Sequence, residues 1–149
     1  MNEDLIRHLN REELVLASKK KRANAFMIDE LIVSVIFLSI IWEPFSALTT
    51  LEEKIVLINY YILEYMLLKI IYHSFFVVQY GASPGKMLMK IQILELSGLS
   101  LPNLLTSINR SIFRVVSEIF FYAGFIWGLL DPNSQTWHDK TARTIVVDV

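Results

Sequence analysis

The sequence contains no cysteine, which excludes disulfide bonds, thiolate metal sites and iron–sulfur clusters. It also lacks a surplus of basic residues, because 14 Lys and Arg stand against 15 Asp and Glu. A nucleic-acid-binding protein needs a face rich in Lys and Arg to neutralise phosphates, so we expect no nucleic-acid partner. Charged residues make up only 19% of the chain, whereas 54% of its residues are hydrophobic. This balance is more apolar than that of an ordinary soluble domain and indicates a membrane protein.

Groups that carry enzyme chemistry are also scarce. The chain has three histidines, His8, His73 and His138. Their positions do not form a spacing typical of metal ligands, and no nucleophile accompanies the pair His138 and Asp139. The segment GASPGK at 81–86 is one residue too short between its glycines for a phosphate-binding loop, and Met87 replaces the required Ser or Thr. We therefore predict no catalytic residue, no metal, no cofactor and no enzymatic activity.

Long apolar runs are the main positive feature of the sequence. A membrane-spanning helix needs roughly 20 mostly apolar residues, and the segments 25–42, 55–80 and 112–130 come close to this length. Pro44 follows the first run, and a proline cannot continue a helix. Glycines in the third run could let it bend back instead of crossing. The sequence thus predicts an all-α membrane protein with two firm transmembrane helices and a third segment that crosses or re-enters.

Basic residues near the runs predict the orientation. The first run is preceded by the cluster Lys19, Lys20, Lys21 and Arg22. Lys and Arg concentrate on the cytoplasmic side of membrane proteins, so we expect a cytoplasmic N-terminus. The loop 43–54 carries one basic residue and three glutamates, which fits the outer side. Lys86, Lys90 and Arg110 follow the second run, and they fit a return of the chain to the cytoplasm.

Two short segments read as β-strands, 89–96 by its alternation of polar and apolar residues and 145–149 by its β-branched residues. They can pair as a cytoplasmic, hairpin-like element only if both lie on one side of the membrane. This favours a cytoplasmic C-terminus, reached if 101–130 forms an interfacial helix and a re-entrant or two-part apolar segment. The alternative is a simple third crossing.

The first 22 residues form a separate cytoplasmic segment, and 23–149 form the membrane domain. Leu5, Leu9 and Leu16 share one helical stripe, which fits an amphipathic helix on the membrane surface. The alternative is a solvated tail. Because this segment lacks the features of a cleaved secretory signal, we expect it to be retained.

Ionisable residues interrupt the apolar runs. Asp29 and Glu30 lie in the first run, where an unpaired charge costs about 2.5 to 3.5 kcal/mol. Arg22 lies two helical turns before Asp29 on the same face, about 10 Å away along the helix. Direct contact would require Arg22 to bend towards Asp29, or a third group to bridge them. The alternative is that Arg22 binds lipid phosphate while both acids lie near the interface.

Further polar residues lie in the other two runs. Lys69 and His73 are four residues apart on one helical face, and Arg114 and Glu118 have the same spacing, which allows an ion pair. Such groups suit a proton or cation relay, or they hold helices together. The polar residues that we expect to support a site are Glu64, Lys69, Lys86, Glu118 and His138.

The segment 81–86 predicts a tight turn at the membrane surface. Pro84 would fix one φ angle and Gly85 would allow a positive one, which leaves Lys86 to bind lipid phosphate. Asp139 is expected to pair with a cytoplasmic cation such as Arg22 or Lys86, or to cap a turn.

Three groups of residues together resemble the RDD family of membrane proteins. They are Arg22 with Asp29, the segment GASPGKMLMKIQILEL at 81–96, and WHDKTARTIVV at 137–147. The resemblance covers most of 20–148. The family is named for one arginine and two aspartates, which correspond here to Arg22, Asp29 and Asp139. The resemblance implies a place in a lipid bilayer, which we expect to be a bacterial inner membrane, and it points to cation/proton antiport.

Two functions follow as hypotheses. In the first, the chain takes part in cation/proton or small-solute transport as a homo-oligomer, because two or three helices are too few to enclose a pathway. Asp29 would then be the site for a monovalent cation or a proton. In the second, the chain is a non-transporting scaffold or accessory subunit that binds a partner or anionic lipid. A dry Asp29 paired with arginine would favour the second, and a wet cavity containing Asp29 and Glu64 the first.

Overall fold

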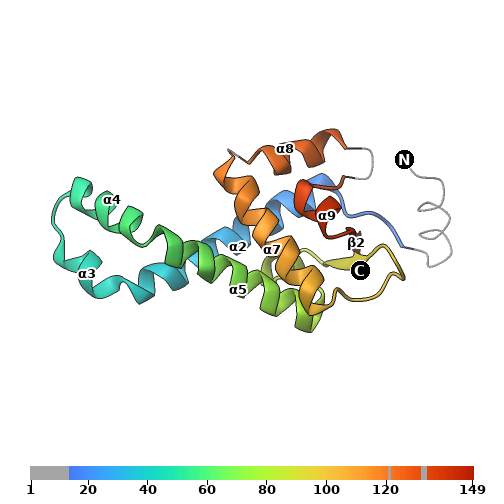
Figure 1. Cartoon of the computed structure of the whole chain (residues 1–149), viewed down its shortest axis with the longest axis horizontal. Helices are drawn as coiled ribbons and strands as arrows, with labels where there is room; N and C mark the ends of the chain where they lie inside the picture. The colour runs from blue at the N-terminus through green and yellow to red at the C-terminus, as the bar shows by residue number, and fades with distance from the viewer. Residues whose placement is uncertain (1–13, 121, 132–133) are drawn as a thin grey trace.

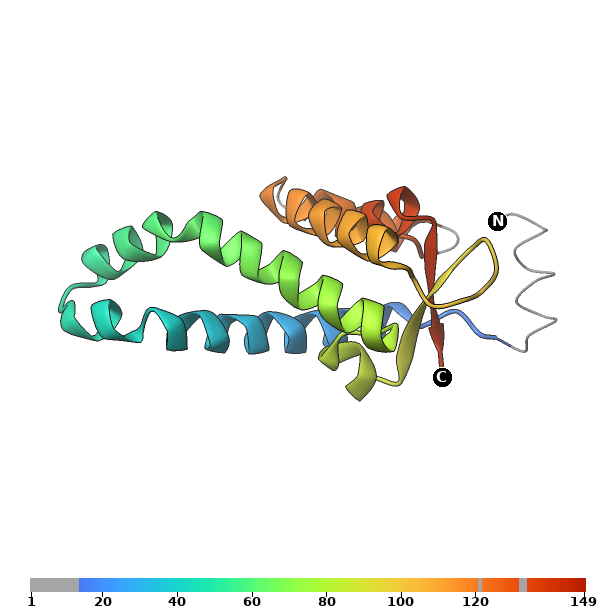
Figure 2. The ribbon, with the colours of Figure 1, turned by 60° about the horizontal axis from the view of Figure 1, so that its bottom comes forward.

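The computed structural model describes residues 14–120, 122–131 and 134–149. Most of the segment predicted to form a surface helix therefore lies outside the described residues. Within them, two helices are long and apolar enough to span a membrane, α2 (Lys19–Ile40) and α5 (Ile62–Tyr80). Figure 2 shows them joined at one end of an elongated molecule, with the strands at the opposite end.

Helix α2 begins earlier than the predicted start at residue 25. The side chain of Ser18 accepts a hydrogen bond from the Lys21 N–H and so caps the helix. Arg22 therefore lies in the first turn of α2 rather than in a segment before it. The helix also ends at Ile40, so Pro44 does not stop it directly.

The connection between the two long helices is itself helical. The predicted loop 43–54 forms α3 (Trp42–Ala47) and the start of α4 (Leu51–Tyr60), which Thr50 and Glu53 cap reciprocally. The predicted second run is not one helix, because α4 ends at Tyr60 and α5 begins at Ile62. The side chain of Asn59 donates to the Ile55 carbonyl in the last turn of α4, where such a bond competes with the backbone ladder.

Large apolar side chains cover the outside of both long helices. The most exposed ones include Met27, Leu31 and Ile40 on α2 and Leu63, Leu67 and Ile71 on α5, each more than half exposed. A soluble monomer rarely exposes so much apolar surface in one region. The buried stripe of α2 instead runs through Ala25, Asp29, Val33 and Phe37. The surface of these helices is therefore suited to lipid contact.

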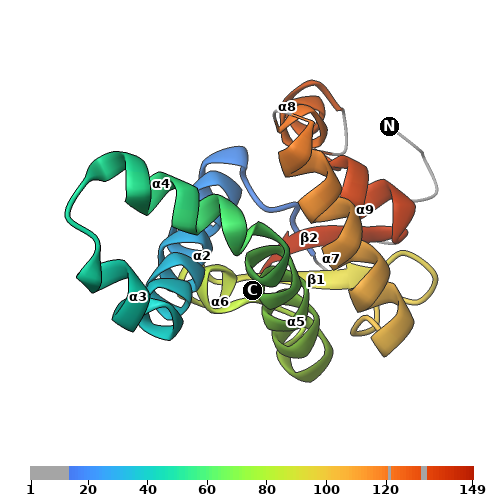
Figure 3. The same cartoon turned by 60° about the vertical axis from the view of Figure 1, so that its left-hand side comes forward.

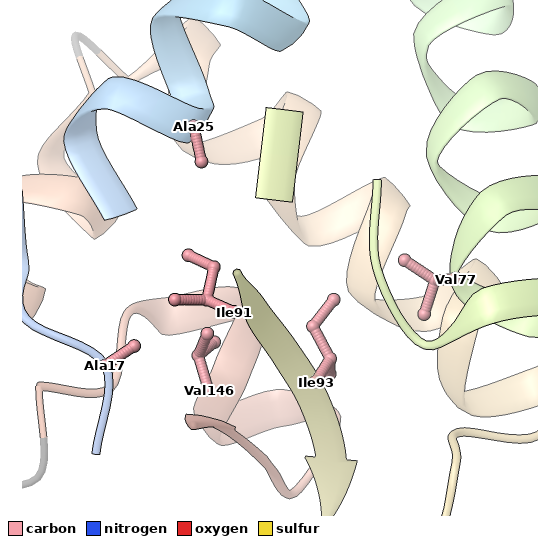
Figure 4. Close-up of a cluster of buried hydrophobic side chains, with 6 residues drawn as sticks. All are labelled: Ala17, Ala25, Val77, Ile91, Ile93 and Val146. Carbon is pink, nitrogen blue, oxygen red and sulfur yellow. The ribbon is translucent and has the colours of Figure 1, made fainter. Parts of the chain in front are cut away.

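The short helix α6 (Pro84–Leu88) leads into β1 (Ile91–Glu95), which pairs antiparallel with β2 (Thr144–Asp148). The predicted strand pairing is confirmed. Leu16 also forms a bridge with Val147, so the segment before α2 reaches the same sheet. Figure 4 shows the core that joins these parts, in which Ala25 of α2 and Val77 of α5 lie close to the strand residues.

The segment 81–86 departs from the predicted turn. The residue with positive φ is Gly81, at 66°, and not Gly85, which belongs to α6. Gly81 ends α5, where the left-handed conformation favours glycine. Helix α6 packs against α2, and Figure 3 shows it beside that helix. The chain is thus reversed by the end of α5 together with a helical turn.

The third apolar run is divided between two helices, α7 (Leu104–Ile119) and α8 (Ala123–Leu130), and the short α9 (Trp137–Thr141) follows. Helix α7 packs against α5, and α8 packs against both α7 and α9 (Figures 1 and 2). The chain then returns to β2 beside β1. The run is thus in two parts, as expected for a C-terminus on the same side as β1, and its path relative to the membrane stays a prediction.

Helix α7 has an inverted amphipathic pattern. Its buried residues are mostly polar: Ser107, Arg110, Ser111, Arg114, Val115 and Ser117. Its outward face carries apolar side chains such as Leu105, at 79% exposed, and Ile119, at 54%. A helix in water would place these two faces the other way round. The polar face of α7 therefore lines the interior of the protein, where the candidate site lies.

Candidate functional site

Asp29 is fully buried and joins three helices. Its Oδ1 accepts hydrogen bonds from the backbone N–H of Gly85, at 2.8 Å, and from the Tyr72 hydroxyl, at 3.2 Å. Its Oδ2 accepts one from the Ser83 hydroxyl, at 2.5 Å. The carboxylate therefore lies at the N-terminus of α6, where unpaired N–H groups favour a negative charge. Neutral donors satisfy Asp29, and the alternative in which it bonds to Arg22 does not occur.

Gly85 allows α6 to approach α2 this closely. A Cβ atom added at Gly85 would lie 2.2 Å from the Ala25 carbonyl oxygen and 2.9 Å from Asp29 Oδ1. Any larger residue would push the two helices apart. The close packing of α6 against α2 thus depends on the small size of Gly85 and not on its freedom of φ.

Lys86 is turned inward, so it does not lie exposed at the surface as the sequence analysis expected. Only 8% of the residue is exposed, because α6 packs against α2. Its Nζ donates to the Ser83 hydroxyl at 3.3 Å. Burial lowers the pKa of Lys86 to about 7, although the charge of Asp29 opposes this shift. This lysine can therefore gain or lose its proton near neutral pH.

Asp139 forms a second buried centre, at the start of α9. It pairs with Arg22 of α2 and Arg110 of α7. It also accepts hydrogen bonds from the Thr136 N–H, at 3.0 Å, and from the Thr136 hydroxyl, at 2.8 Å, in a capping box. Both predictions for Asp139, pairing with Arg22 and capping, are confirmed. Arg110 is a partner that the sequence analysis treated only as a loop charge.

The charges around Asp139 determine its ionisation. Burial alone would raise the pKa of Asp139, but Arg110 and Arg22 outweigh burial and hold it well below the ordinary value. The neighbouring His138 is 3% exposed, and burial lowers its pKa well below the ordinary value. His138 is therefore neutral at pH 7, and its Nε2 lies 2.9 Å from the Thr136 hydroxyl.

A third centre is an ionic network between α2, α5 and α7. Lys69 Nζ lies 2.7 Å from Glu30 and 2.5 Å from Glu118. Arg114 lies 3.1 Å from Glu30 and 3.5 Å from Glu118, which confirms the predicted pair within α7. The side chains of Lys69 and Arg114 are each 5% exposed. Two cations and two carboxylates are thus held together, and we call these four residues the ionic network.

Two residues of the predicted polar stripe in the second run lie outside the ionic network. Glu64 is exposed near the start of α5. His73 is buried, and its Nε2 has no hydrogen-bond partner among the described residues. The spacing of Lys69 and His73 placed them correctly on one helix but did not reveal that the partners of Lys69 come from α2 and α7.

A cavity of about 320 Å³ lies between α2, α7, α8 and α9. Its lining includes the cations Lys19, Arg22, Lys86, Arg110 and Arg114 and the apolar residues Phe26, Met27, Phe125 and Ile126. Asp29 and Glu64 are not among its lining residues, so this is not the acidic cavity that the transport hypothesis placed around Asp29. The described residues also contain no group of three His, Asp or Glu side chains arranged to hold a metal ion.

Comparison with known proteins found one matching family. The model of the RDD family matches residues 16–143 of the chain, a range that contains Arg22, Asp29 and Asp139. No curated protein matches the chain, and no solved structure matches it. The three residues for which the sequence resemblance was drawn thus lie within one matched region, and two of them, Arg22 and Asp139, form a direct ion pair.

Proposed function

The chain belongs to the RDD family of membrane proteins, and we propose that it is a subunit of a homo-oligomeric transporter for protons and monovalent cations. We place it in the inner membrane of a bacterium with a cytoplasmic N-terminus, and we assign it no enzymatic activity. The basic cluster in the first turn of α2 supports this orientation.

The observation that carries the proposal is the depth of the ionic network. Eleven residue steps separate Lys19 from Glu30 in α2, and eleven separate Lys69 from Tyr80 in α5. At about 1.5 Å per residue, Glu30 and Lys69 each lie about 16 Å from the helix end on the expected cytoplasmic side. This is about half of a hydrocarbon layer of roughly 30 Å. Ionisable groups at such a depth mark an ion or proton pathway by default.

Stability alone does not explain the ionic network. Apolar residues of similar volume often hold helices together as well as a buried ion pair does, or better. By contrast, Asp29 accepts three hydrogen bonds, and its role as a cap of α6 explains why its carboxylate is buried. We therefore move the candidate ion site from Asp29 to Glu30, Lys69 and Glu118.

Exchange at this site preserves charge. A monovalent cation held by Glu30 and Glu118 would take the place of one proton on the Lys69 ammonium group. The proton leaves as the cation binds, so the net charge of the site does not change and no uncompensated charge is buried. Two spanning helices cannot enclose a pathway by themselves, and their exposed apolar faces offer surfaces for further copies of the chain.

Cation-driven proton flux in proteoliposomes of the purified chain tests this proposal. We expect flux from the wild type, loss of flux in Glu118→Gln, and full flux in the matched control Glu64→Gln, whose side chain is exposed outside the network. Equal flux in both variants would contradict the assignment of Glu118.

A second candidate function is a non-transporting scaffold or accessory subunit. The burial of Asp29 supports it, because Asp29 and Asp139 accept backbone hydrogen bonds at the starts of the short helices α6 and α9 and hold them in place. Absence of flux from correctly folded wild-type protein would favour this function over transport.

A further inference from the structure

The cavity between α2, α7, α8 and α9 combines two chemically different surfaces. Its cationic part is built from Arg22, Lys86, Arg110 and Arg114. Its apolar part includes Phe26 of α2, whose ring packs edge-on against Tyr122 and Phe125 at 5.9 and 4.9 Å. A small polar ligand would use only the first surface, and an uncharged hydrocarbon only the second.

The cationic part is incompletely neutralised. Arg22 and Arg110 share a single carboxylate, that of Asp139. Among the described residues, no carboxylate lies within ion-pairing distance of Lys86, whose polar contact is the Ser83 hydroxyl. The three linked centres hold five cations, Arg22, Lys69, Lys86, Arg110 and Arg114, and four carboxylates, Asp29, Glu30, Glu118 and Asp139. A buried positive charge in excess is costly unless an anion accompanies it.

Two residues of the cavity lining each carry a buried nitrogen atom without a hydrogen-bond partner. Nη2 of Arg110 and Nδ1 of His138 have no hydrogen-bond partner within the part of the chain that the structure describes. The two residues are 4% and 3% exposed, so bulk water does not readily serve them. Buried polar atoms of this kind are normally satisfied, and a phosphate group offers several acceptor oxygens for an arginine.

The apolar part of the cavity continues onto the lipid-facing surface. Met27 of α2 and Ile126 of α8 line the cavity and are 66% and 54% exposed. A cavity of about 320 Å³ is at the small end of ligand sites, so it accommodates a headgroup and the beginning of a chain but not a whole lipid. The rest of an acyl chain would run outward past Met27 and Ile126 into the bilayer.

We propose that this cavity binds one anionic phospholipid, with its phosphate against Lys86 and Arg110 and its acyl chain leaving between α2 and α8. A zwitterionic headgroup fits less well, because its ammonium group would meet the cations of the lining. The site lies at the first turns of α2, on the expected cytoplasmic side, where anionic lipids attract basic groups. This binding is independent of the proposed transport.

The test is lipid retention by the purified full-length chain, measured by native mass spectrometry after exchange from nanodiscs of defined composition. We expect one phosphatidylglycerol per chain and much weaker retention of phosphatidylcholine. Lys86→Gln should weaken phosphatidylglycerol retention at least about tenfold, since it removes a charge-assisted contact. The matched control is Lys20→Gln, because Lys20 is an exposed lysine in the same turn of α2 as Lys19 and does not line the cavity.

A second variant and a second probe keep the proposal falsifiable if Lys86→Gln fails to fold. Ile126→Asn changes an exposed side chain, and it should weaken lipid retention while leaving the protein folded. Inorganic phosphate should not displace the lipid at millimolar concentration. Equal retention of both lipids, an equal effect of Lys20→Gln and Lys86→Gln, or displacement by inorganic phosphate would each overturn the proposal.

Discussion

Replacing Gly85 by alanine should disrupt the contact between α2 and α6 that Asp29 organises. The new Cβ would lie 2.2 Å from the Ala25 carbonyl oxygen, a distance that real Cβ atoms do not show. The backbone of α6 must then move away by about 1 Å to reach ordinary packing distance. The same movement would lengthen the bond from the Gly85 N–H to Asp29, now 2.8 Å, beyond hydrogen-bonding range.

The cost follows from these two effects. Overpacking of this kind typically costs about 1 to 3 kcal/mol. Loss of a hydrogen bond to a charged group costs about 1.5 to 3 kcal/mol. The sum is about 2.5 to 6 kcal/mol, which corresponds to a fall in melting temperature on the order of 10 °C for a chain of this size.

Thermal unfolding in detergent, followed by circular dichroism, measures this effect. Gly98→Ala is the matched control, because a Cβ added at Gly98 would have no neighbour within 4 Å. We expect Gly98→Ala to melt within about 2 °C of the wild type, since substitutions at open surface sites are nearly neutral. If Gly85→Ala were as stable as Gly98→Ala, the close approach of α6 to α2 and the role of Asp29 as its cap would be refuted.

Three further predictions concern the buried charges. Asp139→Asn should destabilise the protein by about 3 to 5 kcal/mol in the same unfolding assay, because Arg22 and Arg110 would lose their shared carboxylate. The pKa of Asp139 is depressed in the folded protein, so its carboxylate stabilises the fold above its unfolded pKa of about 3.9. This contribution is lost only as pH falls below that value. Acidification from pH 7 to 5 should therefore leave it intact. Retention of phosphatidylglycerol should weaken as pH rises from 6 to 8, because Lys86, with a pKa of about 7, loses its charge over this interval. The charged groups that act on Lys86 from the neighbouring helices are Asp29, Arg110, Arg114 and Asp139. A flat pH profile would show that Lys86 does not contact the lipid.

Local patterns predicted the elements whose form depends on nearby residues. The long apolar runs indicated α2 and α5, and the β-branched and alternating segments indicated β1 and β2. The pair of Arg114 and Glu118 followed from a spacing of four residues within one helix. Each of these features depends on helical or strand periodicity, which the sequence displays directly.

Element ends and breaks were less predictable. The division at Tyr61 involves no proline or glycine, and the predicted turn at 81–86 is partly the helix α6. In both places the backbone conformation depends on contacts such as the bond from the Gly85 N–H to Asp29, which joins residues 56 positions apart. Periodicity does not carry information about such partners.

The sequence by itself indicated a membrane protein of the RDD family with two runs apolar enough to span a membrane, and its resemblance to that family singled out Arg22, Asp29 and Asp139. Only the tertiary structure decided how these charges are used. Asp29 caps α6. Asp139 pairs with Arg22, 117 positions before it in the chain, and with Arg110, 29 positions before it. The physical reason is that a buried charge takes whichever partner folding brings within about 4 Å, and that distance is set by how α2, α5 and α7 pack.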